Sequence, residues 1–301
     1  MRLSSSDLKS LIIFRAVVEH NGFMGAQAAL NLGQATVSFH IKALEDRLGF
    51  RLCHRGRAGF SLTEKGEIAY DHSKTLFSAM SDYESILGEL RHTISGTLRL
   101  GLIDNTISNP GMPMHQVVRS FMKRAPSAKI EISIAVPEQL VTEVGNGGLE
   151  LAIMPETRRY KGLKFSRFYD EQHSLYATTD HPLWREKTIT PASVMMHPFV
   201  IRPYANLVEL QHFPNAQIKA MASNMEAQAM FILSGVVVGY LPDHFAQTWV
   251  DKGEIRPVLN ETTGISSPFF IVTRERERQP LLLRTFVREL VSSSWARTHH
   301  G

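Results

Sequence analysis

The sequence predicts an α+β protein in three parts: a winged helix-turn-helix domain over residues 1–63, a linker and dimerisation helix over 64–93, and an α/β region over 94–301. Three observations carry this prediction. The first part contains a short helix, a tight turn and an amphipathic helix, and the second repeats apolar residues every three or four positions. The third part alternates strands with single helices, which is typical of a parallel sheet. A chain of 301 residues is long enough to form two or three separate hydrophobic cores.

The N-terminal part is expected to contain three helices and a β-hairpin. The helices are expected over residues 7–20, 24–30 and 34–48, with Ser6 as the N-cap of the first. Four apolar residues of the third helix recur every three or four positions and bury one side: Val37, Ile41, Leu44 and Leu48. Two short strands near residues 51–54 and 60–62 then flank a basic tip, so we interpret this hairpin as a wing.

A long helix is predicted to begin after Thr63. Seven of its positions repeat with a mean spacing of about 3.5 residues: Ala69, His72, Leu76, Ala79, Tyr83, Ile86 and Leu90. Such a repeat is typical of a coiled-coil seam, and the polar remainder of the helix favours a partner chain. We therefore predict dimerisation through Leu76, Tyr83, Ile86 and Leu90. The alternative is a helix that packs on the core of its own domain.

The C-terminal part is predicted to begin with a β-α-β-α-β series. Its strands are expected over residues 97–103, 129–136 and 149–154, and its helices over 110–123 and 137–146. Further strands are expected near 174–178, 199–202, 217–221, 236–241 and 268–272, and further helices near 191–195, 224–234 and 280–292. Single helices between strands imply a parallel sheet, in which ligands bind beyond the carboxyl ends of the strands.

Positive charge is concentrated beside the helix-turn-helix pattern. Residues 1–66 hold nine Lys or Arg and five Asp or Glu, whereas the rest of the chain holds 24 of each sign. A basic module with amide, hydroxyl and ammonium groups on an exposed helix suits double-stranded DNA. The residues expected to contact DNA are Gln34, Ala35, Thr36, Ser38, Phe39, His40 and Lys42 on the helix, and Arg55 and Arg57 on the wing. A surface helix beside a basic loop need not bind DNA by itself; spacing, wing and charge together favour it.

No motif in the sequence indicates catalysis. The chain lacks a P-loop, a GxSxG motif and an HExxH motif, so we predict a protein that is not an enzyme and needs no cofactor or metal. Cys53 is the only cysteine, and we interpret it as a small apolar residue rather than a redox sensor. The apolar runs are too short to span a bilayer and no signal-peptide core is visible, which predicts a cytoplasmic protein without membrane contact.

The chain resembles the LysR-type transcriptional regulators over essentially its whole length. The N-terminal match is highly specific: AQAALNLGQATVSFHIKALEDRLGFRLCHR at residues 26–55 and LTEKG at 62–66. Weaker matches follow in the right order, namely LRLGLID at 98–104, LELAI at 149–153, DHPL at 180–183 and SGVVVGYLP at 234–242. The resemblance implies a sequence-specific, ligand-responsive transcription regulator. It also implies a homodimer that assembles to a homotetramer on a DNA operator, with RNA polymerase as a further candidate partner.

The resemblance further implies a periplasmic-binding-protein-like fold of two lobes, with a small-molecule effector in the cleft between them. Lobe I is expected over about 94–166 and 267–301, and lobe II over about 167–266, with crossovers near 164–169 and 264–269. The expected effector-binding residues follow strands or open helices: Asn105, Thr106, Val136, Pro137, Arg202, Ser223 and Asn224. An organic acid is one candidate effector, because Arg202 can clamp a carboxylate, but a salt bridge of Arg202 between the lobes or a solvated Arg202 is an equally good interpretation. Asp104 would repel an anion, which leaves the sign of the effector's charge open.

Several residues depart from the family pattern. Gly22 and Gly33 stand where Ser is frequent, Phe39 stands where Arg or another polar residue is common, and Cys53 replaces a frequent Phe. A base contact at position 39 is therefore not carried over from the family. The alternative class is a solute-binding protein or an enzyme built on the two-lobe region. That class requires a secretion signal or a converging set of titratable groups, and the sequence shows neither.

Overall fold

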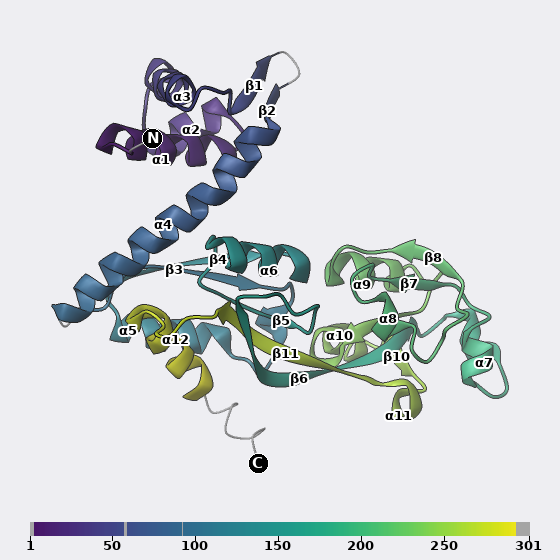
Figure 1. Ribbon diagram of the computed structural model, residues 1–301. Coiled ribbons are helices and arrows are strands. Elements are labelled where there is room, and N and C mark those ends of the chain that lie inside the picture. The colour runs from purple at the N-terminus through teal and green to yellow at the C-terminus, as the bar shows by residue number, and fades with distance from the viewer. Residues whose placement is uncertain (1–2, 57–58, 92, 293–301) are drawn as a thin grey trace. The chain divides into compact units, whose positions relative to one another are not determined.

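The computed structural model describes residues 3–56, 59–91 and 93–292 (Figure 1). The chain forms two compact units: one contains the residues up to Tyr83, and the other contains Glu84–Gly145 and the residues from Leu149 onward. The predicted α+β class is confirmed, with a winged helix-turn-helix, a long helix and a two-lobed α/β domain.

The first unit holds three short helices and a hairpin around one core. These elements are α1 (Ser5–Glu19), α2 (Phe23–Leu30), α3 (Gln34–Leu48), β1 (Cys53–Gly56) and β2 (Gly59–Leu62). The apolar stripe predicted for α3 is confirmed for Val37, Ile41 and Leu44, which are fully buried against α1, while Leu48 packs at the edge of the core. The antiparallel pairing of β1 with β2 makes the expected wing.

The ends of these helices follow local chemistry. The N-cap of α1 is Ser4 rather than the predicted Ser6, because Ser4 and Asp7 form a reciprocal capping box. Gly49 ends α3 in the left-handed region, with φ 77°. Gly22 has φ 128° and lies against Phe60, so the serine that is frequent at this place in the family would be strained here.

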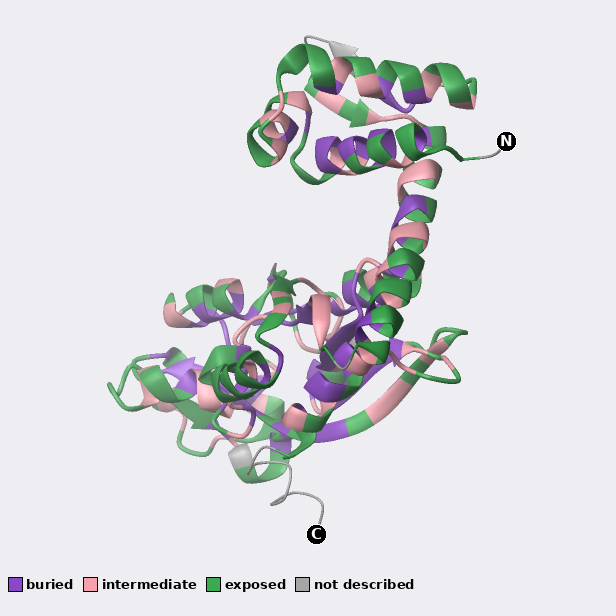
Figure 2. Cartoon of the chain, turned by 90° about the vertical axis from the view of Figure 1, so that its left-hand side faces the viewer, coloured by how far each residue is buried: buried purple, intermediate pink, exposed green. Residues whose placement is uncertain are grey.

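The long helix α4 (Glu64–Leu90) begins where Thr63 Oγ1 accepts a hydrogen bond from the Gly66 N–H at 2.9 Å. Its N-terminal half packs on the core of the first unit, and Leu76 takes part in that packing. Leu76 is thus partly used within its own chain, as the alternative interpretation expects. Tyr83, Ile86 and Leu90 instead remain 62%, 53% and 74% exposed. Exposed segments recur along the long helix in Figure 2. None of the helices in the described ranges is both long and apolar enough to span a membrane.

The second unit is built on a seven-stranded sheet in the order β10-β6-β11-β5-β3-β4, with β9 also paired to β6. Its strands are β3 (Ser95–Leu102), β4 (Ser127–Ile134), β5 (Leu151–Pro155), β6 (Leu163–Thr178), β9 (Gly239–Pro242), β10 (Ile255–Val258) and β11 (Ile265–Arg274). β3 pairs in parallel with β4 and β5, as the β-α-β-α-β series predicts. The strands outside this series pair differently: β6 is antiparallel to β9, β10 and β11.

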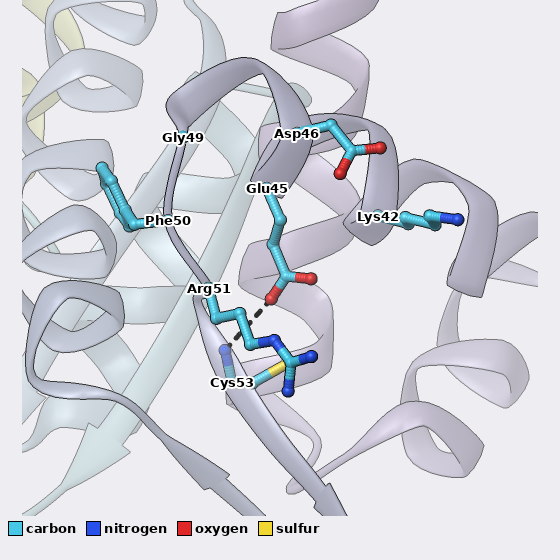
Figure 3. A pocket seen from close by; sticks show the side chains of 7 residues that line it. All are labelled: Lys42, Glu45, Asp46, Gly49, Phe50, Arg51 and Cys53. Carbon is cyan, nitrogen blue, oxygen red and sulfur yellow. Dashed lines mark hydrogen bonds between the residues drawn. The ribbon is translucent and has the colours of Figure 1, made fainter.

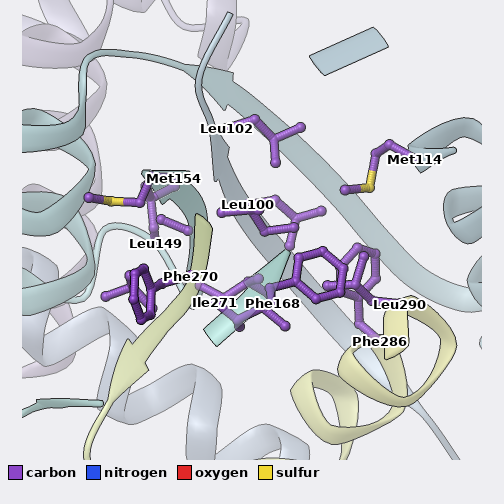
Figure 4. Close-up of a cluster of buried hydrophobic side chains, with 14 of the residues drawn as sticks. Leu100, Leu102, Met114, Leu149, Met154, Phe168, Phe270, Ile271, Phe286 and Leu290 are labelled. Atoms are coloured by element: carbon purple, nitrogen blue, oxygen red, sulfur yellow. The ribbon is translucent and has the colours of Figure 1, made fainter. Parts of the chain in front are cut away.

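Lobe I consists of the parallel strands and the helices that cover them. These helices are α5 (Met114–Arg124), α6 (Pro137–Asn146) and α12 (Leu281–Ser292), preceded by the short turn η1 (Thr106–Ser108). Side chains of β3, β11 and α12 meet in the core, including Leu100, Phe270 and Phe286 (Figure 4). This core fixes the end of β3, after which the candidate ligand residues begin.

Lobe II contains a second small sheet and several short helices. Its elements are η2 (Pro182–Arg185), α7 (Pro191–Val194), β7 (Phe199–Ile201), α8 (Asn206–Glu209), β8 (Ile218–Met221), α9 (Met225–Leu233), α10 (Asp243–Val250) and α11 (Asn260–Thr263). β6 supplies Phe168 and Tyr169 to the core of lobe I, then Leu175 and Tyr176 to the two cores of lobe II. The two lobes therefore share β6 and its partner β11.

Candidate functional site

The outer face of α3 displays most of the residues predicted to read DNA. Gln34, Ala35, Thr36, Phe39 and Lys42 are all exposed, and Ser38 is half-buried. They lie on one helix because the buried stripe of Val37, Ile41 and Leu44 turns the opposite positions toward solvent. This face presents amide, hydroxyl, aromatic and ammonium groups, which suits base edges and phosphates.

The N-terminus of α3 is open to an anion. Gly33 is its N-cap and makes no side-chain cap hydrogen bond, so no capping side chain accepts from the N–H groups of the first turn. Anions bind favourably at such helix ends because the helix dipole and free N–H groups act together. A Cβ at Gly33 would meet nothing within 4 Å, and φ is −70°, so a serine would also fit here. The departure from the family pattern at Gly33 therefore has no steric cause.

His40 differs from the other residues of the predicted set. It is half-buried, and its Nδ1 lies 3.0 Å from the Ser10 hydroxyl on α1. Burial and the nearby charge of Lys9 lower the pKa of His40. One ring nitrogen is thus engaged by α1, which makes His40 a poorer candidate for a base contact than its exposed neighbours.

The wing is only partly described. The backbone of Arg55 lies in β1, opposite Phe60 of β2. The Arg55 side chain and the whole of Arg57 fall outside the described residues, so their predicted contacts with DNA stay predictions.

A shallow hollow of about 600 Å³ lies between α3 and the first wing strand. It is lined by Lys42, Glu45, Asp46, Gly49, Phe50, Arg51 and Cys53. The Glu45 carboxylate accepts hydrogen bonds from the backbone N–H groups of Leu52 at 2.8 Å and Cys53 at 3.4 Å, while Lys42 is directed away from Glu45 (Figure 3). Glu45 therefore joins the wing to α3, and the buried Cys53 lines the same hollow.

The predicted effector residues lie at the expected strand ends and helix starts of the second unit. Asn105 has φ 46°, and both polar atoms of its side-chain amide are buried without a hydrogen-bond partner. Thr106 is buried, and its hydroxyl donates to the Ile103 carbonyl at 2.9 Å. Val136 precedes α6, which Pro137 opens. Asn224 is the N-cap of α9, with its side chain accepting from the Ala227 N–H at 2.8 Å, and Ser223 is exposed beside it.

The Arg202 side chain is already engaged by residues of its own lobe. Its Nε donates to Glu209 at 2.8 Å, its backbone N–H donates to the other carboxylate oxygen at 2.8 Å, and its Nη1 donates to the Tyr204 hydroxyl at 3.2 Å. Arg202 and Glu209 are both buried. The salt-bridge interpretation of Arg202 holds, but the partner lies in the same lobe rather than across the boundary between lobes.

Asp104 connects the two lobes directly. One of its carboxylate oxygens accepts a hydrogen bond from the backbone N–H of Met225, the first residue of α9, at 2.5 Å. Burial raises the pKa of Asp104, and this effect outweighs the opposing influence of the Met225 N–H and the Arg202 charge. A carboxylate from lobe I thus already occupies the N-terminus of a lobe II helix.

A second polar network at the lobe boundary centres on Glu171 of β6. Its two carboxylate oxygens lie 2.9 Å from His173 Nε2 and 2.9 Å from His244 Nε2, and Asn109 donates to it at 3.3 Å. Nδ1 of His244 lies 2.9 Å from the Ser108 hydroxyl. The network thereby ties lobe I residues to α10 of lobe II. The hydrogen bonds and charges of the two histidines outweigh burial and lower the pKa of Glu171 to about 2.

This network was missed from the sequence. Glu171, His173 and His244 are not among the residues that the sequence predicts to bind an effector. The local signal is the run DEQHS at residues 170–174, where Glu171 and His173 share one face of a strand because they are two residues apart. The contribution of His244 has no such signal, because it comes from an element about 70 residues later.

We expect Glu171→Gln to destabilise the second unit by about 3 kcal/mol at pH 6, since a pKa lowered from 4.5 to about 2 corresponds to that order of free energy. Because the folded-state pKa is depressed, this stabilisation is present above about pH 4.5 and is lost as the pH falls toward 2. Urea unfolding of both proteins should therefore differ at pH 6 and converge on acidification. Asp170→Asn, which removes a partly exposed carboxylate from the same strand, serves as the control. Parallel pH profiles for Glu171→Gln and the wild type would contradict the prediction.

Comparison with known proteins agrees with both units. Residues 8–67 match the family model described as bacterial regulatory helix-turn-helix protein, lysR family, and residues 91–294 match the LysR substrate binding domain. The chain is 32% identical to the HTH-type transcriptional activator BauR of Pseudomonas aeruginosa over 295 residues, covering 97% of each chain. It is 27% identical to the RuBisCO operon transcriptional regulator of Allochromatium vinosum over 299 residues, again covering 97% of each.

A solved structure shows the same fold. Full-length CbnR in complex with its target DNA has a TM-score of 0.64 at 18% identity, covering 94% of this chain and 98% of that chain. The two family matches together extend over most of the chain. The helix-turn-helix match covers the first unit, and the substrate-binding match covers the two lobes that follow it. The chain therefore belongs to the LysR family of transcriptional regulators, DNA-binding proteins with an effector-binding domain, and is not an enzyme.

Proposed function

We propose that the protein binds a specific two-part operator in double-stranded DNA as a homodimer and responds to a small-molecule effector held between its lobes. The observation that carries the proposal is the exposed polar face of α3 in a module with excess positive charge. The exposed stripe of Tyr83, Ile86 and Leu90 on α4 supports pairing with a second chain. Two paired chains present two recognition helices to successive major grooves.

The effector contacts the residues that follow β3 and those that open α6 and α9: Asn105, Thr106, Val136, Pro137, Ser223 and Asn224. The unpartnered amide of Asn105 supports this placement, because a ligand with one donor and one acceptor would satisfy both of its buried polar atoms. Arg202 contributes its positive charge while it remains paired with Glu209. An organic acid stays one candidate effector, although it must compete with the Asp104 carboxylate for the N-terminus of α9.

Two dimers assemble into a tetramer on the operator, as the resemblance to the LysR-type regulators implies, and the effector changes the distance between the paired DNA-binding domains. It acts only through a difference in affinity for two quaternary states. RNA polymerase is the candidate partner through which such a change alters transcription, and the cytoplasm is where operator and polymerase are found.

The first test is the selection of an operator from random duplexes with the full-length protein. We expect the selected site to bind at least about 1,000-fold more tightly than random DNA at the same salt concentration. Gln34→Ala should then relax the preference for one base pair in each half-site, by about 1–3 kcal/mol, and leave the affinity for random DNA unchanged.

Ile12→Ala is the control for this experiment, because Ile12 is an exposed residue of the same unit that lies on α1 and not on α3. Equal affinity of the wild type for selected and random duplexes would overturn the proposed function.

A further inference from the structure

The recognition helix carries an exposed aromatic ring among polar groups. Phe39 is 68% exposed and is the most exposed phenylalanine in the described part of the chain. Its neighbours on the same face, three and four residues away, are Ala35, Thr36, Lys42 and Ala43, all of which are exposed. A partner that covers this ring removes apolar surface from water, which favours binding.

The position of this ring is restrained by contacts inside the unit. The Phe39 ring meets the His40 ring edge to face, at 5.6 Å between centroids and an interplanar angle of 76°. His40 is in turn held by the buried Ser10 hydroxyl of α1, at 3.0 Å. Burial and the charge of Lys9 lower the pKa of His40, which favours the neutral ring and suits an apolar contact with Phe39. A ring held in place before binding loses less conformational entropy when it is covered.

The surroundings of Phe39 indicate which partner covers it. The excess positive charge of residues 1–66 and the ammonium group of Lys42 one turn away suit a polyanion rather than an apolar protein surface. In the major groove, the base edges present donors and acceptors throughout, with one apolar exception, the C5 methyl group of thymine.

We infer that Phe39 reads the C5 methyl group of a thymine in each half of the operator, with His40 as its positioning residue. The inference rests on the proposed function, since it assigns a base to the face of α3 that reads DNA. It also gives the departure of Phe39 from the family pattern a physical role, because the polar side chains common at this position cannot make the same apolar contact.

The experiment uses the full-length protein and its selected operator, in which each thymine is replaced in turn by deoxyuridine. This replacement removes the methyl group and keeps every hydrogen-bonding group of the base. We expect one symmetry-related pair of positions at which each lost methyl weakens wild-type binding about fourfold. Elsewhere in the site the replacement should change little.

Phe39→Ala should bind the operator about tenfold less tightly or worse, and it should bind the thymine and uracil forms of the sensitive pair equally. Phe39→Leu, which keeps an apolar side chain, should retain part of the discrimination. Ile12→Ala is the matched control, because it removes another half-exposed apolar side chain from the same unit, on α1. It should leave the whole thymine-to-uracil profile unchanged.

His40→Ala tests the positioning role. With Phe39 still present, this change should reduce the ratio of the affinity for the thymine duplex to the affinity for the uracil duplex at the sensitive pair. A merely structural loss would lower the affinity for both duplexes by the same factor and leave this ratio unchanged.

The outcomes separate the inference from the proposed function. A wild type that does not distinguish the selected operator from random DNA refutes the proposed function. A wild type that binds specifically but tolerates uracil at every position overturns the inference alone. The inference alone is also overturned if Phe39→Ala weakens binding but keeps the full discrimination between thymine and uracil.

Discussion

Ile86→Lys is expected to weaken binding to the two-part operator by about 100-fold or more and to leave binding to a single half-site unchanged. Ile86 lies between Tyr83 and Leu90 on the exposed stripe of α4. A lysine in the middle of an apolar seam leaves a charge that the partner helix must desolvate, so pairing is lost. Each half-site is then bound by a separate chain. The affinity that a dimer gains by binding the second half-site while it is already held on the first is lost.

Two measurements check this prediction together. Sedimentation should show a shift of Ile86→Lys toward monomer, and titration with half-site and full-site duplexes should show the loss on the full site alone. Glu84→Lys is the control: it changes the charge of the same helix by more, but position 84 lies on nearly the opposite side from position 86. A variant that stays dimeric and binds the full site normally would contradict the assignment of the seam.

Arg202→Met is expected to destabilise the second unit by about 3–5 kcal/mol, because it leaves the Glu209 carboxylate buried without its cationic partner. Glu209 also accepts a hydrogen bond from the buried Gln228 at 3.0 Å, so the loss falls on a connected network. Urea unfolding of the full-length protein, monitored by the tryptophans of lobe II, measures the change.

The double variant Arg202→Met with Glu209→Gln should recover a large part of this loss, since it removes both buried charges. Arg167→Met is the matched control, because it breaks the exposed pair with Asp170 and should cost at most about 1 kcal/mol. Similar losses for Arg202→Met and Arg167→Met would show that the buried pair is not the source of stability.

Much of the fold was predictable because the deciding signals are local. The bounds of α3 and α6 agree with the predictions, since apolar spacing together with Gly49 or Pro137 defines them within a few residues. The parallel pairing of β3 with β4 and β5 follows from single helices between strands. On α3, the candidate DNA-reading helix, the same periodicity that buries Val37 also determines which residues are exposed.

The remainder depends on contacts between distant segments. The antiparallel pairing of β6 with β11 joins residues about 100 positions apart, and the sequence predicted only the last third of β6 as a strand. The sequence left Arg202 open between a ligand contact and a salt bridge, because its partner, Glu209, lies on the short helix α8, which has no periodic signal. His40 was placed with the DNA contacts because its hydrogen bond to Ser10 comes from a different helix.

The long strands β6 and β11 make lobe II an insertion within lobe I. The chain leaves lobe I along β6, builds the whole of lobe II, and returns along β11, with ten residue pairs and one bulge at Phe269 and Phe270 joining the two strands. A lobe II taken from a relative could therefore be grafted at two junctions inside this ladder, without altering α3 or α4. Such chimeras would combine one operator with many inducers, which makes the paired strands a practical place to engineer new biosensors.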